Sequence, residues 1–367
     1  GYQLEINNTF GFCIRFKELL LCNDQTKIVF YPWFENTSNI KTNPTMARKL
    51  RIIFMGTPDF AVESLKSLVE SGSEIVGVIT APDRPAGRGQ KLQESAVKKY
   101  AISQNLKVLQ PEKLKNPEFL TELKSLNANL QVVVAFRMLP EVVWNMPEYG
   151  TFNLHGSLLP QYRGAAPINW AIINGEKESG VTTFFIEKEI DTGKILFQEK
   201  VKIEKNDTAG ILHDKLMDIG GKLVVKTVRA IENEDYSETS QNSLCADEQK
   251  LKPAHKIFKQ DCKLDWSQPM ESIHNFVRGL SPYPCAWTEF KKEGKTIATK
   301  IYSIEILDTD EHSFSVSTDN KEYIHVSTPH GKLSIVEFQP AGKRNMTVID
   351  YLKGNSFEDA KLLINPS

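Results

Sequence analysis

An amide, an imidazole and a carboxylate occur in the middle of this sequence in an arrangement suited to acyl transfer. Asn153 and His155 are two residues apart, and Asp191 follows in an Asp-Thr-Gly turn. On a strand, residues two apart point to the same face. An amide can donate to a carbonyl oxygen that becomes negative in a transition state, and an imidazole moves protons near neutral pH. We therefore interpret these three as catalytic residues that pass an acyl group between nitrogens, with Asp191 orienting and charge-stabilising the imidazole.

An Asn-x-His pair on a strand is often only a turn or core feature with satisfied hydrogen bonds. Here the run continues through Ser157, Leu158, Leu159 and Pro160, and no Ser, Cys or Lys is placed as a covalent nucleophile. The whole segment resembles the folate-dependent formyltransferases. That resemblance implies that the Asn, His and Asp are the catalytic set. It also implies that the turn Ser157-Leu158-Leu159-Pro160 binds folate.

The composition indicates an ordinary globular protein with room for two domains. The chain has 367 residues, of which 40% are hydrophobic and 25% charged, with a formal net charge of −1. A nucleic-acid partner would therefore need a local basic patch, because the field of the whole molecule is weak. The cysteines are odd in number and lack CxxC spacing, which favours reduced thiols in a cytoplasmic setting and argues against zinc. No apolar run approaches the length of a membrane span.

Residues 1–45 lack a clear periodicity, and Leu19-Leu20-Leu21 is too short for a secretory signal. Met46 is followed at once by a strand-like run. We interpret 1–45 as an N-terminal extension outside the fold, with a targeting segment as the alternative.

From residue 50, short apolar runs alternate with helical patterns. Strands are expected at 50–55, 75–80, 130–135, 150–154, 181–186 and 196–203, and helices at 60–70, 118–126, 166–174 and 209–233. This α/β alternation predicts a mostly parallel, helix-covered sheet with its ligand crevice beyond the carboxyl ends of strands. The turn Gly56-Thr57-Pro58-Asp59 lacks GxGxxG, so we do not expect a dinucleotide. A tight turn in which Thr57 or Asp59 caps the next helix is the simpler interpretation.

The sequence changes character beyond residue 235. Polar residues with Ser and Asn indicate a linker over 236–262, which separates a catalytic domain at 46–235 from a second domain at 263–367. In the second domain a helix is expected at 270–278. Short strands at 286–290, 296–307, 313–317, 323–327 and 332–339 predict a small β-barrel.

A basic loop indicates which of the folate-dependent formyltransferases the chain resembles most. Arg84, Arg88 and Lys91 lie in a stretch interrupted by Gly and Pro, and such a stretch is either a solvated surface loop or a phosphate contact. Together with 54–61 and 163–168, it closely resembles the methionyl-tRNA formyltransferases. Residues 50–205 carry most of that resemblance. One departure is Phe136-Arg137, near the expected folate pocket, where many members have Tyr-Gly.

The resemblance implies a Rossmann-like formyltransferase fold with a C-terminal OB-like barrel. It also implies formyl transfer from 10-formyltetrahydrofolate to the α-amino group of methionine on initiator tRNA, for translation initiation. Arg84, Arg88 and Lys91 would then contact tRNA, and no metal, membrane or second copy of the chain is expected. The alternatives are a formyltransferase acting on glycinamide ribonucleotide, a hydrolase releasing formate, and a tRNA-binding protein without catalysis.

Overall fold

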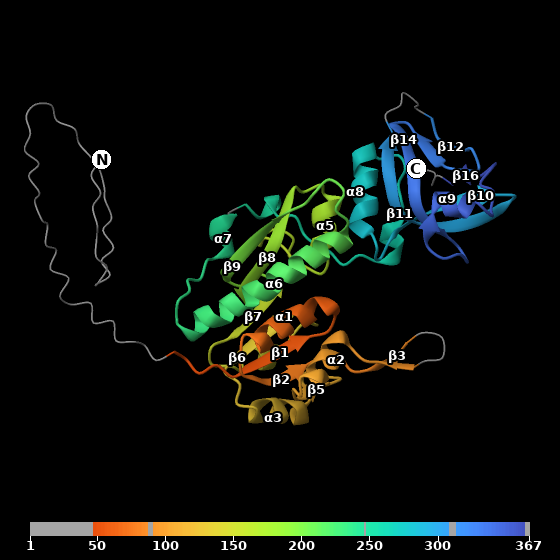
Figure 1. Ribbon diagram of the computed structural model, residues 1–367. Helices are drawn as coiled ribbons and strands as arrows, with labels where there is room; N and C mark the ends of the chain where they lie inside the picture. The colour runs from red at the N-terminus through yellow and green to blue at the C-terminus, as the bar shows by residue number, and fades with distance from the viewer. Residues whose placement is uncertain (1–46, 87–90, 246, 308–312, 364–367) are drawn as a thin grey trace, which may run out of the picture. The chain divides into compact units, whose positions relative to one another are not determined.

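The structure is a computed structural model that describes residues 47–86, 91–245, 247–307 and 313–363. Two sheets organise these residues, and the polypeptide reaches the second sheet after completing the first (Figure 1). None of the described helices combines the length and the apolar composition that a membrane crossing requires.

The first sheet has seven strands in the order β5-β2-β1-β6-β7-β8-β9. The five strands from β5 to β7 pair in parallel, whereas β8 pairs antiparallel with β7 and β9 antiparallel with β8. The mostly parallel sheet predicted from the sequence is thus confirmed. Its strands are β1 Ile52–Gly56, β2 Ile75–Ile79, β5 Val108–Leu109, β6 Leu130–Val134, β7 Thr151–His155, β8 Glu178–Phe185 and β9 Ile195–Lys202.

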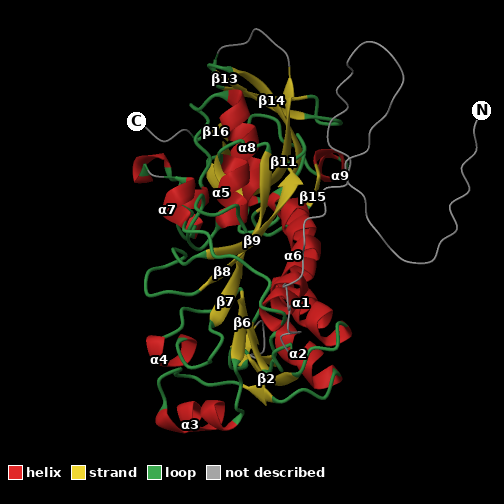
Figure 2. Cartoon of the chain, turned by 90° about the vertical axis from the view of Figure 1, so that its left-hand side faces the viewer, coloured by secondary structure: helices red, strands yellow, loops and turns green. Residues whose placement is uncertain are grey.

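Helices cover both faces of this sheet because its central strands are apolar on both sides. In β1, Ile52 and Phe54 pack into one hydrophobic core, and Ile53 and Met55 pack into another. Helices α1, α2 and α6 lie on the first side and α3 and α4 on the second (Figure 2). The helices within residues 47–245 are α1 Asp59–Glu70, α2 Ala96–Ser103, α3 Pro117–Ser125, α4 Glu141–Trp144, α5 Pro167–Ile173, α6 Ala209–Glu232 and α7 Gln241–Leu244.

The turn from β1 to α1 is tight. A Cβ added at Gly56 would lie 2.6 Å from Ala61 Cβ, so the close approach of the helix requires glycine. Pro58 occupies the N-cap and no side chain caps the helix, so the predicted cap by Thr57 or Asp59 is wrong. The basic loop that follows β2 is a short hairpin of β3 (Arg84–Ala86) and β4 (Lys91–Gln93).

The second sheet is antiparallel, with the order β12-β13-β14-β11-β10-β16, and β15 pairs with β14. Contacts between β12 and β16 bring the two ends together, which confirms the predicted barrel. Its elements are α8 Met270–Leu280, β10 Ala286–Lys292, β11 Lys295–Leu307, β12 Ser315–Thr318, β13 Ile324–Thr328, β14 Gly331–Pro340, β15 Met346–Thr347, α9 Val348–Leu352 and β16 Lys361–Leu362. Besides α7, the predicted linker contains the 3₁₀ turns Glu248–Lys250 and Lys259–Cys262.

Candidate active site

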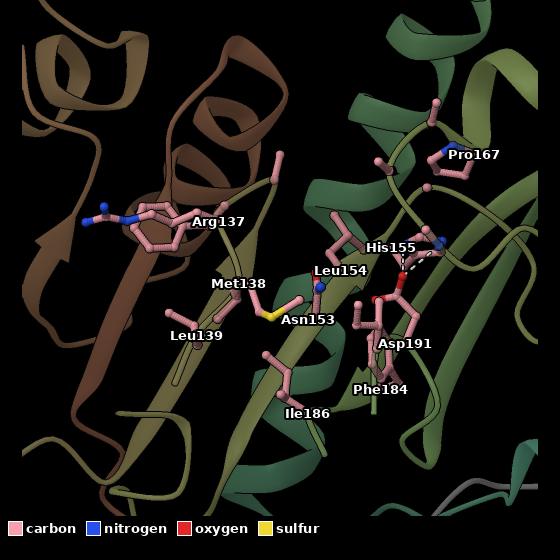
Figure 3. Close-up of a pocket in the computed structure, with 18 of the residues that line it drawn as sticks. Arg137, Met138, Leu139, Asn153, Leu154, His155, Pro167, Phe184, Ile186 and Asp191 are labelled. Carbon is pink, nitrogen blue, oxygen red and sulfur yellow. Dashed lines mark hydrogen bonds and ion pairs between the residues drawn. The ribbon is translucent and has the colours of Figure 1, made fainter. Parts of the chain in front are cut away.

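A cavity of about 700 Å³ opens beside the carboxyl ends of β6 and β7, where a mostly parallel sheet is expected to bind ligands. Its wall is largely apolar, with Leu154, Phe184 and Ile186 among the side chains that line it (Figure 3). Asn153, His155 and Asp191 also line this cavity. The structure therefore brings the three predicted catalytic side chains together.

Asn153 and His155 reach the cavity from β7, whose alternation gives them the same face. Asn153 Oδ1 is buried and accepts no hydrogen bond from the described residues. A buried acceptor without a partner costs about 1–3 kcal/mol, and such exceptions call for an explanation.

His155 is buried, with 7% of the residue exposed, and its ring is held through one nitrogen. His155 Nε2 lies 2.8 Å from the carbonyl oxygen of Tyr162. A carbonyl can only accept, so Nε2 carries the proton and Nδ1 presents its lone pair when the ring is neutral. Nδ1 lies 3.8 Å from Asp191 Oδ2, too far for a hydrogen bond but close enough for charge interaction. The orienting contact predicted for Asp191 thus comes from the Tyr162 backbone, while Asp191 supplies the negative charge.

Asp191 is fixed by contacts on both its side chain and its backbone. Its Oδ2 accepts a hydrogen bond from Gly164 N at 2.9 Å, and its φ of +55° is left-handed. A Cβ added at Gly193 would lie 1.7 Å from the Phe185 carbonyl oxygen, so only glycine fits beside that strand. Gln241 Nε2 donates to the carbonyl oxygens of Asp191 and Gly193, both at 2.8 Å. Gln241 is a residue that sequence reasoning missed, because no pattern connects α7 with this turn.

The predicted folate-binding turn lies elsewhere: Ser157, Leu158, Leu159 and Pro160 are not among the described residues that line the cavity. Ser157 Oγ donates to the Gln161 carbonyl at 2.7 Å, and Leu159 packs with Phe184 and Ile195. Through Leu159 the turn packs against Phe184, which lines the cavity, and its contact with folate stays a prediction.

The predicted tRNA contacts are described only in part. Arg84 is exposed on β3, Arg88 lies outside the described residues, and only the backbone of Lys91 is described, in β4. Arg137, which lines the cavity, has its pKa lowered by burial and by the nearby charge of Arg84. The hairpin therefore carries positive charge close to the cavity.

Arg137 occupies the departure from the family pattern. Its guanidinium donates to the carbonyls of Pro111 and Glu112 and lies 5.6 Å from the centre of the Phe136 ring. In Figure 3 it is directed away from Asn153. Arg137 therefore places a cation on the cavity wall at a distance from Asn153. No group of three or more His, Cys, Asp or Glu suited to a metal occurs in the described part of the chain.

A family model described as formyl transferase matches residues 49–228, and one described as formyl transferase, C-terminal domain, matches residues 256–356. The chain is 53% identical over 314 residues to the methionyl-tRNA formyltransferase of Bacteroides thetaiotaomicron, an alignment covering 84% of this chain and 97% of that relative. It is 56% identical over 310 residues to the methionyl-tRNA formyltransferase of Parabacteroides distasonis, covering 83% and 95%. The chain belongs to the methionyl-tRNA formyltransferase family. This membership confirms the resemblance read from the sequence.

Solved structures support the fold. WlaRD, a sugar 3N-formyl transferase solved with dTDP and 5-N-formyl-THF, matches with a TM-score of 0.57 at 22% identity, covering 81% of this chain and 100% of its own. The N-formyltransferase of Helicobacter canadensis matches with a TM-score of 0.55 at 23% identity, covering 79% and 99%. At these identities the likeness extends to the fold alone.

Proposed function

We propose that the chain transfers a formyl group from 10-formyltetrahydrofolate to the α-amino group of methionine on charged initiator tRNA. Relatives bearing the name methionyl-tRNA formyltransferase are 53% and 56% identical to it over alignments that cover 97% and 95% of their own length. The observation that carries the proposal is the meeting of Asn153, His155 and Asp191 at one cavity.

The cavity fits the co-substrate in size and in chemistry. Ligand sites are commonly clefts of about 300–1,000 Å³ with mainly apolar walls and a few polar groups. The cavity here, at about 700 Å³, falls in that range, and Asn153 and His155 are among the polar side chains on its wall. The bound folate supplies a formyl group carried on nitrogen.

Asn153 is suited to stabilise negative charge. Its amide lines the cavity, and no hydrogen bond joins that amide to the described residues, so it can turn its N–H groups toward an oxygen that becomes negative during transfer. One such preorganised donor typically contributes about 3 kcal/mol to transition-state stabilisation.

His155 is suited to take the proton that the attacking amine must lose and to pass it to the folate nitrogen, which gains a proton as its bond to the formyl carbon breaks. Because Nε2 is already bonded to the Tyr162 carbonyl, the available base is Nδ1. The resulting imidazolium lies between that carbonyl and Asp191, and both of them favour positive charge. With 3.8 Å between His155 Nδ1 and Asp191 Oδ2 and an effective dielectric constant of about 20, the electrostatic attraction between carboxylate and imidazolium is roughly 4 kcal/mol.

A second cavity, of about 930 Å³, offers a route for the acceptor end of tRNA. It shares Ala165, Ala166 and Asn169 with the first cavity. Its other lining residues include the cations Lys256, Lys259 and Lys300 and the aromatic residues Tyr283 and Trp287. Cations beside aromatic rings suit single-stranded nucleic acid, because phosphates pair with the cations and bases stack on the rings.

The other activities left open by the sequence are less well supported. Transfer to glycinamide ribonucleotide, or release of formate, leaves the barrel and the second cavity without a role. A tRNA-binding protein without catalysis leaves the partnerless Asn153 and the fixed pair of His155 and Asp191 unexplained. We also propose that the protein works as a monomer in the cytoplasm. Its catalytic domain would span residues 46–235 and its second domain residues 263–367. Sedimentation at micromolar protein concentration tests the monomeric state.

The deciding experiment measures formyl transfer from 10-formyltetrahydrofolate to charged initiator tRNA, charged elongator methionine tRNA and free methionine. We expect efficient transfer to the initiator tRNA alone. Transfer to free methionine at a comparable rate, or release of formate without an acceptor, would contradict the proposal.

A further inference from the structure

Tyr162 connects the catalytic histidine with the linker. Its carbonyl oxygen accepts the hydrogen bond from His155 Nε2. Its backbone adopts a left-handed φ of +61°, which bulky residues seldom adopt, while its side chain is buried at 5% exposure. Surrounding contacts must therefore hold this residue in place.

The Tyr162 phenol is anchored by polar partners. It donates to Glu176 Oε1 at 2.5 Å and accepts from Asn174 Nδ2 at 3.2 Å. Burial and the hydrogen bond with Glu176 raise the pKa of the phenol, so it remains a donor. Burial acts to raise the pKa of Glu176, but hydrogen bonds from Lys252 and Tyr162 hold it below its usual range. Lys252 Nζ reaches the same carboxylate oxygen at 2.6 Å.

Backbone contacts join the same segment to the linker. Tyr162 N donates to the Lys252 carbonyl at 2.7 Å, Ala254 N to the Arg163 carbonyl at 2.8 Å, and Ala165 N to the Ala254 carbonyl at 2.7 Å. Gly164 pairs in parallel with Ala254, and a Cβ added at Gly164 would lie 2.5 Å from the Ala254 carbonyl oxygen. Linker residues 252–254 thus run alongside residues 162–165, joined to them by backbone hydrogen bonds and one isolated β-bridge.

Residues 162–164, which the linker holds in this way, supply a polar contact to both His155 and Asp191. Tyr162 O holds the imidazole, and Gly164 N holds Asp191 Oδ2 at 2.9 Å. We propose that Tyr162 is a positioning residue, whose carbonyl fixes the Nε2–H form of His155 and whose phenol and backbone tie that carbonyl to Lys252. The inference rests on the proposed function, because it assigns Tyr162 a part in the same proton transfer. A purely structural Tyr162 would support the core and leave the His155 tautomer unaffected.

The first test needs no substrate and so stands apart from the test of the proposed function. The test uses NMR spectra of ¹⁵N-labelled full-length protein. The signals of the His155 ring nitrogens are identified as those that disappear in the His155→Asn variant, and their chemical shifts are then followed against pH. We expect a neutral ring protonated at Nε2 and unprotonated at Nδ1. A neutral ring protonated at Nδ1 would overturn the inference, whatever the enzyme formylates.

The second test separates positioning from packing. Tyr162→Phe keeps the ring but removes the anchoring hydroxyl, and Lys252→Met removes only the ammonium that holds Glu176. We expect kcat to fall about 10- to 100-fold in each, with the KM values for folate and charged tRNA unchanged, since small misplacements of catalytic groups have effects of this size. We also expect the His155 nitrogen signals to shift.

Two controls match these changes. Lys200→Met breaks the 2.8 Å pair between Lys200 on β9 and Glu178 on β8, and Tyr100→Phe alters a tyrosine packed against the same core as Tyr162. Both should retain wild-type kcat. If the Tyr162→Phe variant fails to fold, the Lys252→Met variant by itself tests the positioning role of Tyr162. Wild-type kcat and unshifted His155 signals in Lys252→Met would refute the positioning role.

Discussion

Replacing Asp191 by Asn separates the charge of this side chain from its position. Asn keeps the size of the aspartate and an oxygen that can accept the hydrogen bond from Gly164 N, which is 2.9 Å long in the structure. The turn is also held by Gln241, which bonds to backbone carbonyls and is indifferent to this change. The variant should therefore fold normally and lose only the negative charge beside His155.

The distance between Nδ1 and Oδ2 sets the size of the effect. At 3.8 Å, one unit charge acting on an imidazolium contributes roughly 4 kcal/mol at an effective dielectric constant of about 20. Since 1.36 kcal/mol corresponds to tenfold in rate, complete loss would slow proton transfer by about 10³-fold. The amide dipole retains part of this stabilisation, so we expect kcat to fall by about 10² to 10³.

The assay is single-turnover formylation at saturating folate and charged initiator tRNA, with thermal unfolding measured in parallel. Glu189→Gln is the control, because Glu189 is another carboxylate on the cavity wall but is exposed. It should change the rate by less than about threefold, as expected where solvent screens the charge. An Asp191→Asn enzyme with an unchanged rate and unfolding temperature would remove the carboxylate charge from the mechanism.

Four further outcomes are expected. Asn153→Ala should lower kcat by about 10²- to 10³-fold with little effect on tRNA affinity, measured by steady-state kinetics beside filter binding. His155→Ala should lower turnover by about 10²- to 10⁴-fold while folate still binds, which calorimetry can check. Arg84→Ala should weaken tRNA binding and reduce the slope of log affinity against log salt by about one, and an unchanged slope would leave Arg84 an ordinary surface cation. A chain that begins at Met46 should unfold cooperatively and formylate normally, and loss of cooperativity would show that residues 1–45 support the fold.

The sequence predicted the helices and strands in which the pattern of apolar and polar side chains shows which faces are buried. The apolar run near residue 52 belongs to a strand buried on both faces, and the amphipathic pattern of α6 runs over Ala209–Glu232. It did not predict β5, because Val108–Leu109 is too short to show a period. Nor did it predict the antiparallel direction of β8, since alternation along a strand is the same whichever way its neighbour runs.

Within the site, residue type was informative where a side chain carries out the chemistry. Asn153 and His155 share a face because they are two apart on β7, and a carboxylate from another loop completes the group. The turn at 157–160 was harder to place, because Ser157 and Leu159 fit equally well a turn facing a ligand and one facing the core. In the structure both turn inward, since the Ser157 hydroxyl bonds to the Gln161 carbonyl and Leu159 packs against Phe184.

The contacts that orient the catalytic pair could not be read from residue types at all. The Tyr162 carbonyl and the Gly164 N–H are backbone atoms that nearly every residue possesses, so no pattern of side chains identifies them. Their direction follows from the conformation of residues 162–164, and that conformation depends on the backbone pairing with the linker at Ala254, far away in the sequence. A substitution in the linker can therefore change the proton chemistry of His155 without contacting it, because a shift of the linker backbone would move the Tyr162 carbonyl that accepts the hydrogen bond from the ring.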